Sequence, residues 1–234
     1  KIVHDYPSLS VGRLNKYRDR VKKYINRKPD GRIFSNKFVQ GGLDYKDGIS
    51  SIYRDMGVDQ GFFDIKEKKH EYDLVYSGSI DGREGLIIEL SRLATLGFSI
   101  LIIGEVNEDI RKYFKLNKNV EFTGRVERNE LPDLYRLAKA GLNYTPNIYP
   151  FNCQTSTKTL EYLATGIGLV SNHNSWIDQF SMHNKYKPLW IDDITCKEDF
   201  DCTSFTELNV LDYNWNSILK KSGINSFLES ILSK

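Results

Sequence analysis

The segment from residue 144 to residue 170 carries residue types that could bind a phosphate group. It reads YTPNIYPFNCQTSTKTLEYLATGIGLV, and its middle predicts a helix that begins with Ser156, Thr157 and Lys158. The amino end of a helix attracts anions, because its N–H groups and the positive end of its dipole point the same way. Lys158 adds a cation, and Glu161 adds a carboxylate for hydroxyl groups on the same helix face. This combination would suit a nucleotide-sugar.

Glycines follow three of the predicted strands, at Gly78, Gly104 and Gly124. In an open parallel sheet, ligands bind beyond the carboxyl ends of the strands, and glycine there lets the backbone approach a ligand closely. The alternative is that each glycine simply ends its strand.

The loop after the first of these strands, residues 78–85, is rich in glycine and contains Arg83. Its spacing matches neither the P-loop nor the dinucleotide fingerprint. Two interpretations stay open: Arg83 is a cation that faces phosphate, or it is a surface residue in a tight connection.

Apolar strands alternate with amphipathic helices from residue 73 to residue 191. The strands are predicted at 74–77, 98–103, 120–123, 140–144, 168–171 and 188–191, and the helices at 84–96, 108–114, 130–139, 156–166 and from 175. Strands that lack polar alternation are typical of a parallel sheet covered on both faces. We therefore predict an α/β, Rossmann-like domain over 73–200, which follows a charged linker at 64–72 and precedes C-terminal helices at 201–234.

Residues 1–63 differ from the rest and read as a remnant of another, N-terminal domain with few apolar residues for a core of its own. Short strands are predicted at 32–39 and 50–54. Before them, apolar residues recur at helical spacing opposite a basic face made of Arg13, Lys16, Arg18, Arg20, Lys22, Lys23, Arg27 and Lys28. Such a helix can lie on an anionic membrane, but we favour the simpler interpretation of a solvated basic face.

The composition excludes several classes of protein. The chain has 234 residues, of which 40% are hydrophobic and 27% charged, as in ordinary soluble globular proteins. A net charge of +2 is too small to indicate a nucleic-acid partner, and no apolar run approaches the ~18 residues of a membrane span. Cys153, Cys196 and Cys202 show no metal spacing, which favours reduced thiols in the cytoplasm.

Residues 73–172 resemble the nucleotide-sugar-binding C-terminal domain of a GT-B glycosyltransferase, from the retaining group-1 (glycogen synthase-like) superfamily. The resemblance is carried by the strands that end at glycine, by VEFTGRV at 120–126 and by EYLATG at 161–166. MGVD at 56–59, followed by Phe62 and Phe63, resembles the passage between the two domains of that family.

The resemblance implies a role for each matching residue. Glu161 corresponds to the second Glu of the family's E-x7-E motif, which binds the donor ribose, and the backbone near Arg125 and Val126 corresponds to the site of the base. The full set of donor-binding residues that we predict is Gly78, Ser79, Arg83, Gly104, Gly124, Arg125, Val126, Ser156, Thr157, Lys158 and Glu161. Because the family is generally metal-independent, we expect no metal and no cofactor besides the nucleotide-sugar substrate.

The sequence departs from the family pattern at several positions. Cys153 stands where the first Glu of the motif belongs, and Gln154-Thr155-Ser156 replaces the usual Gly-Phe-Gly. Ser79 and Glu84 stand where the family has the basic pair that clamps the diphosphate, and Arg83 and Lys158 could compensate.

The sequence thus predicts the donor-binding half of a retaining glycosyltransferase. The whole enzyme would transfer a sugar from a nucleotide-diphosphate donor to a glycan, lipid or cell-envelope acceptor, and we assign no catalytic residue. We expect a cytoplasmic protein, with peripheral membrane contact through the absent N-terminal domain as an open alternative. Two other functions stay open: a non-catalytic module that binds a partner, and a sugar-nucleotide epimerase.

Overall fold

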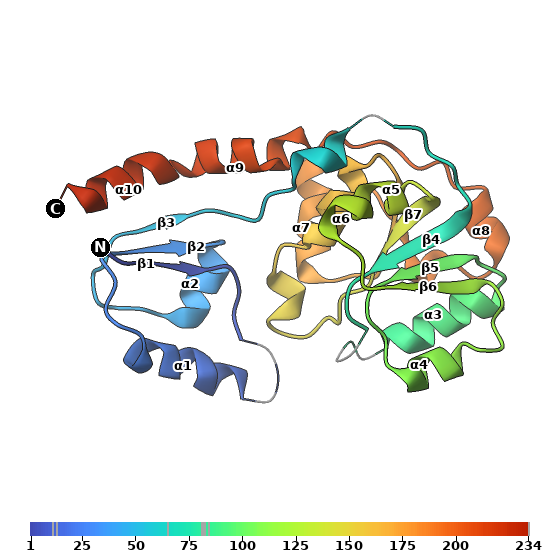
Figure 1. Ribbon diagram of the computed structural model, residues 1–234, viewed down its shortest axis with the longest axis horizontal. Coiled ribbons are helices and arrows are strands. Elements are labelled where there is room, and N and C mark those ends of the chain that lie inside the picture. Colours follow the sequence, from blue (N-terminus) through green and yellow to red (C-terminus); the bar gives the residue numbers. More distant parts are fainter. Residues whose placement is uncertain (11, 13, 65, 81–82, 84, 234) are drawn as a thin grey trace. The chain divides into compact units, whose positions relative to one another are not determined.

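The computed structural model describes residues 1–10, 12, 14–64, 66–80, 83 and 85–233. Within the segments predicted above, residues 11, 13, 65, 81–82, 84 and 234 therefore lie outside the described part; they include Arg13 of the basic face and Glu84. Packing divides the chain into two units (Figure 1). The first comprises Lys1–Asp59, Ile148–Thr155 and Leu211–Lys234, and the second comprises Gln60–Asn147 and Ser156–Val210.

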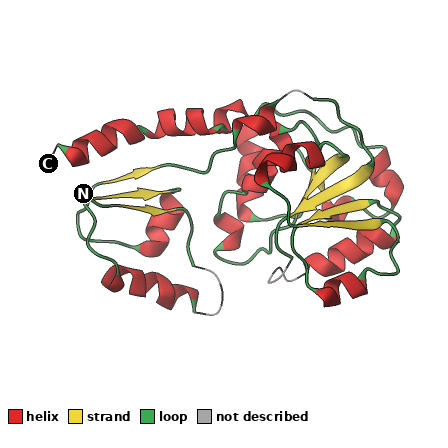
Figure 2. Cartoon of the chain, viewed as in Figure 1, coloured by secondary structure: helices red, strands yellow, loops and turns green. Residues whose placement is uncertain are grey.

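The second unit is built on a six-stranded sheet with the order β6-β5-β4-β7-β8-β9. Figure 2 shows strands of this unit in yellow with red helices around them. Its strands are β4 (Tyr72–Ser77), β5 (Ile100–Ile103), β6 (Val120–Gly124), β7 (Ala138–Asn143), β8 (Gly168–Ser171) and β9 (Leu189–Trp190). All its neighbouring strands pair in parallel. The predicted α/β, Rossmann-like architecture with helices on both faces is therefore confirmed.

Helices cover this sheet because its strands are apolar on both sides; Leu74, Val75 and Tyr76 are all fully buried. The helices of the unit are α3 (Leu86–Thr95), α4 (Glu108–Tyr113), α5 (Leu131–Tyr135), α6 (Thr157–Ala164), α7 (Ser175–Asn184) and α8 (Lys197–Asp201). Side chains from α3, α4 and α8 form the core on one face. On the other face, the Tyr162 ring of α6 packs directly on β7, because Gly141 has no Cβ; a Cβ there would lie 2.2 Å from the ring.

One predicted helix of this unit is wrong in extent. The helix expected at 130–139 is only the short α5, which follows a 3-10 turn at Arg128–Glu130. Ala138 instead pairs with Tyr72 and begins β7. The residues from 137 to 140 are good helix formers by local propensity, but pairing with a buried neighbouring strand outweighs that preference.

The first unit contains a three-stranded parallel sheet, ordered β1-β2-β3. Its elements are β1 (Val3–Tyr6), α1 (Asn15–Ile25), β2 (Gly31–Phe34), α2 (Lys37–Leu43), β3 (Ser51–Tyr53), α9 (Trp215–Ser222) and α10 (Ile224–Leu232). The strand predicted at 32–39 ends at Phe34, because the Asn36 side chain accepts a hydrogen bond from Val39 N (3.0 Å) and caps α2.

This unit has more of a core than the sequence indicated. Two clusters of buried side chains pack on its sheet: one consists of Tyr6, Leu9, Phe34, Val39 and Leu43, and the other of Ile33, Phe227 and Ile231. The second cluster joins α10 to β2. Residues 211–234 therefore belong with residues 1–59, whereas the sequence suggested a separate group of helices at 201–234.

Candidate functional site

The three predicted glycines lie together at the carboxyl edge of the six-stranded sheet. Gly78 N donates to the carbonyl of Ile103 (2.8 Å), and Gly104 N donates to the carbonyl of Gly124 (3.0 Å). Gly104 has a φ of +141°, and a Cβ on it would lie 2.8 Å from the carbonyl oxygen of Gly78. The ends of β4, β5 and β6 thus approach closely at the edge where ligands of such sheets bind.

The amino end of α6 is held at the same edge. Ser156 is its N-cap: the Ser156 side chain accepts a hydrogen bond from Thr159 N, and its hydroxyl donates to Oδ1 of Asn143 (2.9 Å). Asn143 is the last residue of β7, which pairs with β4. Thr157, the first helical residue, is half-buried. The helix start predicted from sequence therefore lies beside the glycine loops, with its positive end toward them.

The Lys158 side chain is half-buried and packs against β4. Its Nζ lies 3.3 Å from Tyr76 Oη and 4.3 Å from the centroid of the Tyr76 ring. A Cβ on Gly78 would lie 3.3 Å from this Nζ. Burial lowers the pKa of Lys158 well below its ordinary value, and the charge of Arg83 lowers it further, while Glu161 opposes both.

Arg83 is half-buried, and its Nη1 donates to the carbonyl of Tyr144, just after β7 (2.9 Å). The side chain therefore turns back onto the sheet edge, close enough to Lys158 for the two positive charges to repel. Beside them, the carbonyl of Ser79 accepts a hydrogen bond from Tyr76 Oη (2.8 Å). Two basic side chains thus lie at the sheet edge where α6 begins, an arrangement that an anion would stabilise.

Glu161 lies deeper, and its carboxylate is covered. The residue is 3% exposed; Oε1 accepts from Nη2 of Arg128 (2.8 Å), and Oε2 lies 3.3 Å from Tyr135 Oη. Tyr135 Oη also lies 2.7 Å from Oγ of Ser77, the last residue of β4. The Glu161 carboxylate is therefore buried and paired in this state, and it is not open to solvent.

Arg125 and Val126 follow Gly124 at the end of β6; Arg125 is exposed and Val126 is half-buried. They therefore lie at the sheet edge where the base is expected to bind, but their role in holding the base stays a prediction. Sequence reasoning missed Arg128, Tyr135 and Tyr76. Arg128 lies in a polar run that is typical of any surface loop, and the tyrosines lie within apolar patterns, so no local signal marked them.

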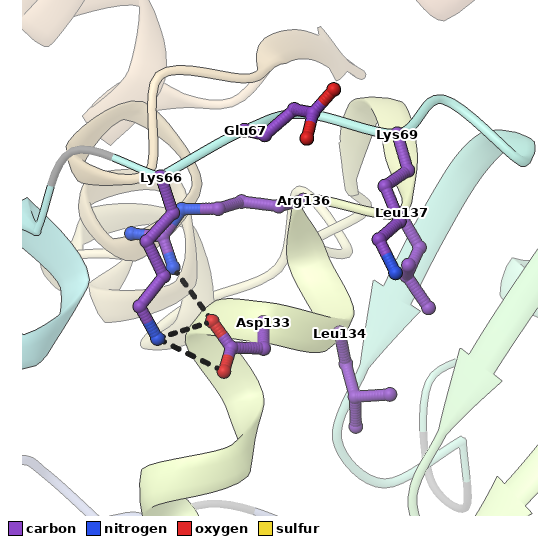
Figure 3. Close-up of a pocket in the computed structure, with 7 residues that line it drawn as sticks. All are labelled: Lys66, Glu67, Lys69, Asp133, Leu134, Arg136 and Leu137. Atoms are coloured by element: carbon purple, nitrogen blue, oxygen red, sulfur yellow. Dashed lines mark hydrogen bonds and ion pairs between the residues drawn. The ribbon is translucent and has the colours of Figure 1, made fainter.

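A pocket of about 380 Å³ lies elsewhere in the second unit (Figure 3). It is lined by Lys66, Glu67, Lys69, Asp133, Leu134, Arg136 and Leu137. Lys69 N donates to the carbonyl of Arg136 (3.0 Å) just before β4 and β7 begin, so the pocket lies at the amino edge of the sheet. Three of its charged side chains pair with each other: Lys66 Nζ and Arg136 Nη1 lie 2.8 Å and 3.1 Å from Asp133 Oδ1. None of the predicted donor-binding residues lines it.

Within the ranges that the structure covers, no three His, Cys, Asp or Glu side chains gather in a way that could hold a metal ion. Among the helices of the described residues, none is both long and apolar enough to cross a bilayer.

The order of the strands, the glycine-lined carboxyl edge and the helix that begins at Ser156 together define the fold of the GT-B glycosyltransferases, and solved structures agree. HepE of Anabaena, in complex with UDP-glucose, is 15% identical with a TM-score of 0.71, and the match covers 97% of this chain and 72% of HepE. Sucrose-phosphate synthase of Thermosynechococcus elongatus is 14% identical with a TM-score of 0.68, over 99% of this chain and 68% of that one.

AviGT4, a glycosyltransferase involved in avilamycin A biosynthesis, is 16% identical with a TM-score of 0.56, over 86% of this chain. The chain spans 62% of the length of AviGT4. No family model matches the chain, and no curated protein matches it. At these identities the similarity establishes the fold.

Proposed function

We propose that the second unit binds the nucleoside-diphosphate part of a sugar donor. The observation that carries this proposal is the placement of two basic side chains at the carboxyl edge of the sheet: Lys158 of α6 lies against Tyr76 and Gly78, and Arg83 donates to the carbonyl of Tyr144. Holding two cations together in a partly buried place costs free energy, and a bound diphosphate would recover it. This site would also offset negative charge on a diphosphate leaving group without a metal ion.

The ribose would bind to Glu161 after Arg128 has moved away. Arg128 is an exposed partner, since 54% of its side chain is accessible to solvent, whereas only 4% of the Glu161 side chain is. The guanidinium itself can be solvated when it turns away, and two ribose hydroxyls would then replace it as donors, so that the buried carboxylate is not left without a partner. Backbone groups near Arg125 and Val126 would hold the base.

The full protein would be a retaining glycosyltransferase that transfers the sugar to a glycan, lipid or cell-envelope acceptor. The fold supports a transferase of this type, and the nucleotide most worth testing first is UDP, because HepE was crystallised with UDP and with UDP-glucose. We place the protein in the cytoplasm, with access to membrane-linked acceptors. We expect this chain to bind the nucleotide but to catalyse sugar transfer poorly.

Calorimetric titration with UDP, UDP-glucose, GDP and ADP tests the proposal. We expect binding of at least one of them, and a loss of about tenfold or more in Glu161→Gln, because a hydrogen bond to a charged group contributes ~1.5–3 kcal/mol. Lys112→Gln, on the exposed surface of the same unit, is the matched control. If none of the four ligands binds at millimolar concentration, the proposal is wrong.

A non-catalytic module of the same fold is the second candidate, and the Glu161–Arg128 ion pair favours it, because it closes the ribose site in this state. Titration of the intact protein with UDP-glucose separates the two candidates. A transferase binds the donor, whereas a partner-binding module whose ribose site stays closed by Arg128 does not.

A further inference from the structure

Helix α1 of the first unit exposes three of its four large apolar side chains and buries its acidic one; the fourth, Val21, is half-buried. Tyr17, Tyr24 and Ile25 are 67%, 87% and 75% exposed, and Leu14, just before the helix, is 64% exposed. Asp19 is buried at 7% exposure and accepts hydrogen bonds from Ser10 N (3.1 Å) and from Lys22 Nζ (2.8 Å). A helix on the surface of a globular protein normally shows the opposite arrangement.

The inward face of α1 is held by polar contacts. Besides the Asp19 contacts, Lys23 Nζ donates to the carbonyl of Asp44, the C-cap of α2, and lies 5.5 Å from the centroid of the Tyr45 ring. These contacts fix the rotation of α1 about its axis, and with it the outward direction of Tyr24 and Ile25.

Positive charge borders the apolar stripe. At 100° per residue, Tyr17, Val21, Tyr24 and Ile25 fall within one third of the helix circumference. The exposed basic residues in and just after the helix are Lys16, Arg18, Arg20, Arg27 and Lys28. Asp19 is the only acidic residue between 14 and 28, so nothing in this segment offsets that charge at the surface.

We propose that α1 lies in the interface of an anionic lipid bilayer. Its tyrosine and isoleucine side chains would enter the boundary between headgroups and acyl chains, and its arginine and lysine side chains would contact lipid phosphates. Duplex DNA offers phosphates, but its bases are paired and stacked, so it offers no apolar surface of comparable size to Ile25 and Leu14. A second copy packed on the same face would bring the same positive charges together, which is unfavourable.

Sedimentation with lipid vesicles tests this proposal. We expect the chain to bind vesicles of phosphatidylcholine with 30% phosphatidylglycerol, to bind pure phosphatidylcholine at least tenfold more weakly, and to lose most binding at high salt. Arg18→Gln combined with Arg20→Gln should weaken binding about 25-fold, at roughly fivefold per charge. Tyr24→Ser combined with Ile25→Ser should weaken it at least tenfold.

The matched control is Ile88→Ser combined with Leu116→Ser, two equally exposed apolar residues of the second unit, which should bind vesicles as the original chain does. Circular dichroism checks that all variants fold. The proposal is overturned if the chain does not bind anionic vesicles, or if both serine pairs weaken binding equally. It is also overturned if the chain self-associates and the Tyr24→Ser, Ile25→Ser variant abolishes that self-association without weakening vesicle binding. Binding of duplex DNA, and not of vesicles, would overturn it as well.

Discussion

Arg128 Nη2 lies 2.8 Å from Oε1 of Glu161, and this pair joins an exposed side chain of a 3-10 turn to a buried carboxylate of α6. The Arg128 guanidinium also lies 5.5 Å from the centroid of the Phe62 ring. Since Glu161 is the residue that we propose for the ribose, Arg128 occupies the place that the donor hydroxyls would take. The pair therefore makes the ligand-free site a closed one.

Arg128→Gln should strengthen nucleotide binding. The donor would no longer displace a charged partner from Glu161, and a partly exposed ion pair is worth up to ~1 kcal/mol, so we expect an increase of up to about fivefold in affinity for UDP. Calorimetry measures this directly, with Lys115→Gln on the exposed surface as control. Weaker binding in the variant would mean that Arg128 orients Glu161 or contacts the donor itself.

Nucleotide affinity should fall as pH rises, through Lys158. Burial lowers the pKa of Lys158 in the unliganded protein, and a bound diphosphate raises it again. Between those two pKa values binding takes up a proton, so affinity decreases with pH by up to tenfold per unit; below the lower value it is constant. Calorimetry in two buffers of different ionisation enthalpy measures the proton uptake. Lys158→Met should abolish that uptake, and an unchanged uptake in this variant would assign the proton to another group.

The same Lys158→Met variant should fold more stably. The pKa of Lys158 is lower in the folded chain than in the unfolded chain, so the unfolded chain holds the proton more tightly. At pH 7 the lysine therefore lowers the free energy of unfolding. This destabilisation disappears when the pH rises above the ordinary pKa of lysine, where both states are neutral. We expect the free energy of unfolding, measured by urea denaturation, to rise by ~1–2 kcal/mol, and the nucleotide affinity to be lost. A variant that is less stable than the original chain would show that the ammonium contact with Tyr76 outweighs the cost of burial.

Gly104→Ala should destabilise the second unit and weaken nucleotide binding. The residue has a φ of +141°, and its new Cβ would lie 2.8 Å from the carbonyl of Gly78, so the strand ends must move apart. We expect a loss of ~1–3 kcal/mol in the free energy of unfolding. Gly61→Ala is the matched control, since no atom lies within 4 Å of its Cβ position and its φ is not positive. Equal effects of both substitutions would contradict this account.

Local patterns in the sequence were sufficient for much of the second unit. Runs of apolar residues that end in glycine predicted β4, β5 and β6, and a serine before a helical repeat predicted the start of α6. Such signals are visible without a structure because they depend on side-chain periodicity and on capping, which involve residues only a few positions apart. They failed where strand pairing outweighed propensity, as at Ala138.

The contacts that decide how the site works join residues that are far apart in the chain, and only the tertiary structure shows them. Tyr76 meets Lys158 across 82 residues, Arg128 meets Glu161 across 33, and α10 covers β2 through Phe227. The sequence determined which residue types were present at the sheet edge and on α1. Which of them face a ligand, each other or solvent was decided by packing between distant segments, because burial and pairing are properties of the folded chain and not of any local pattern.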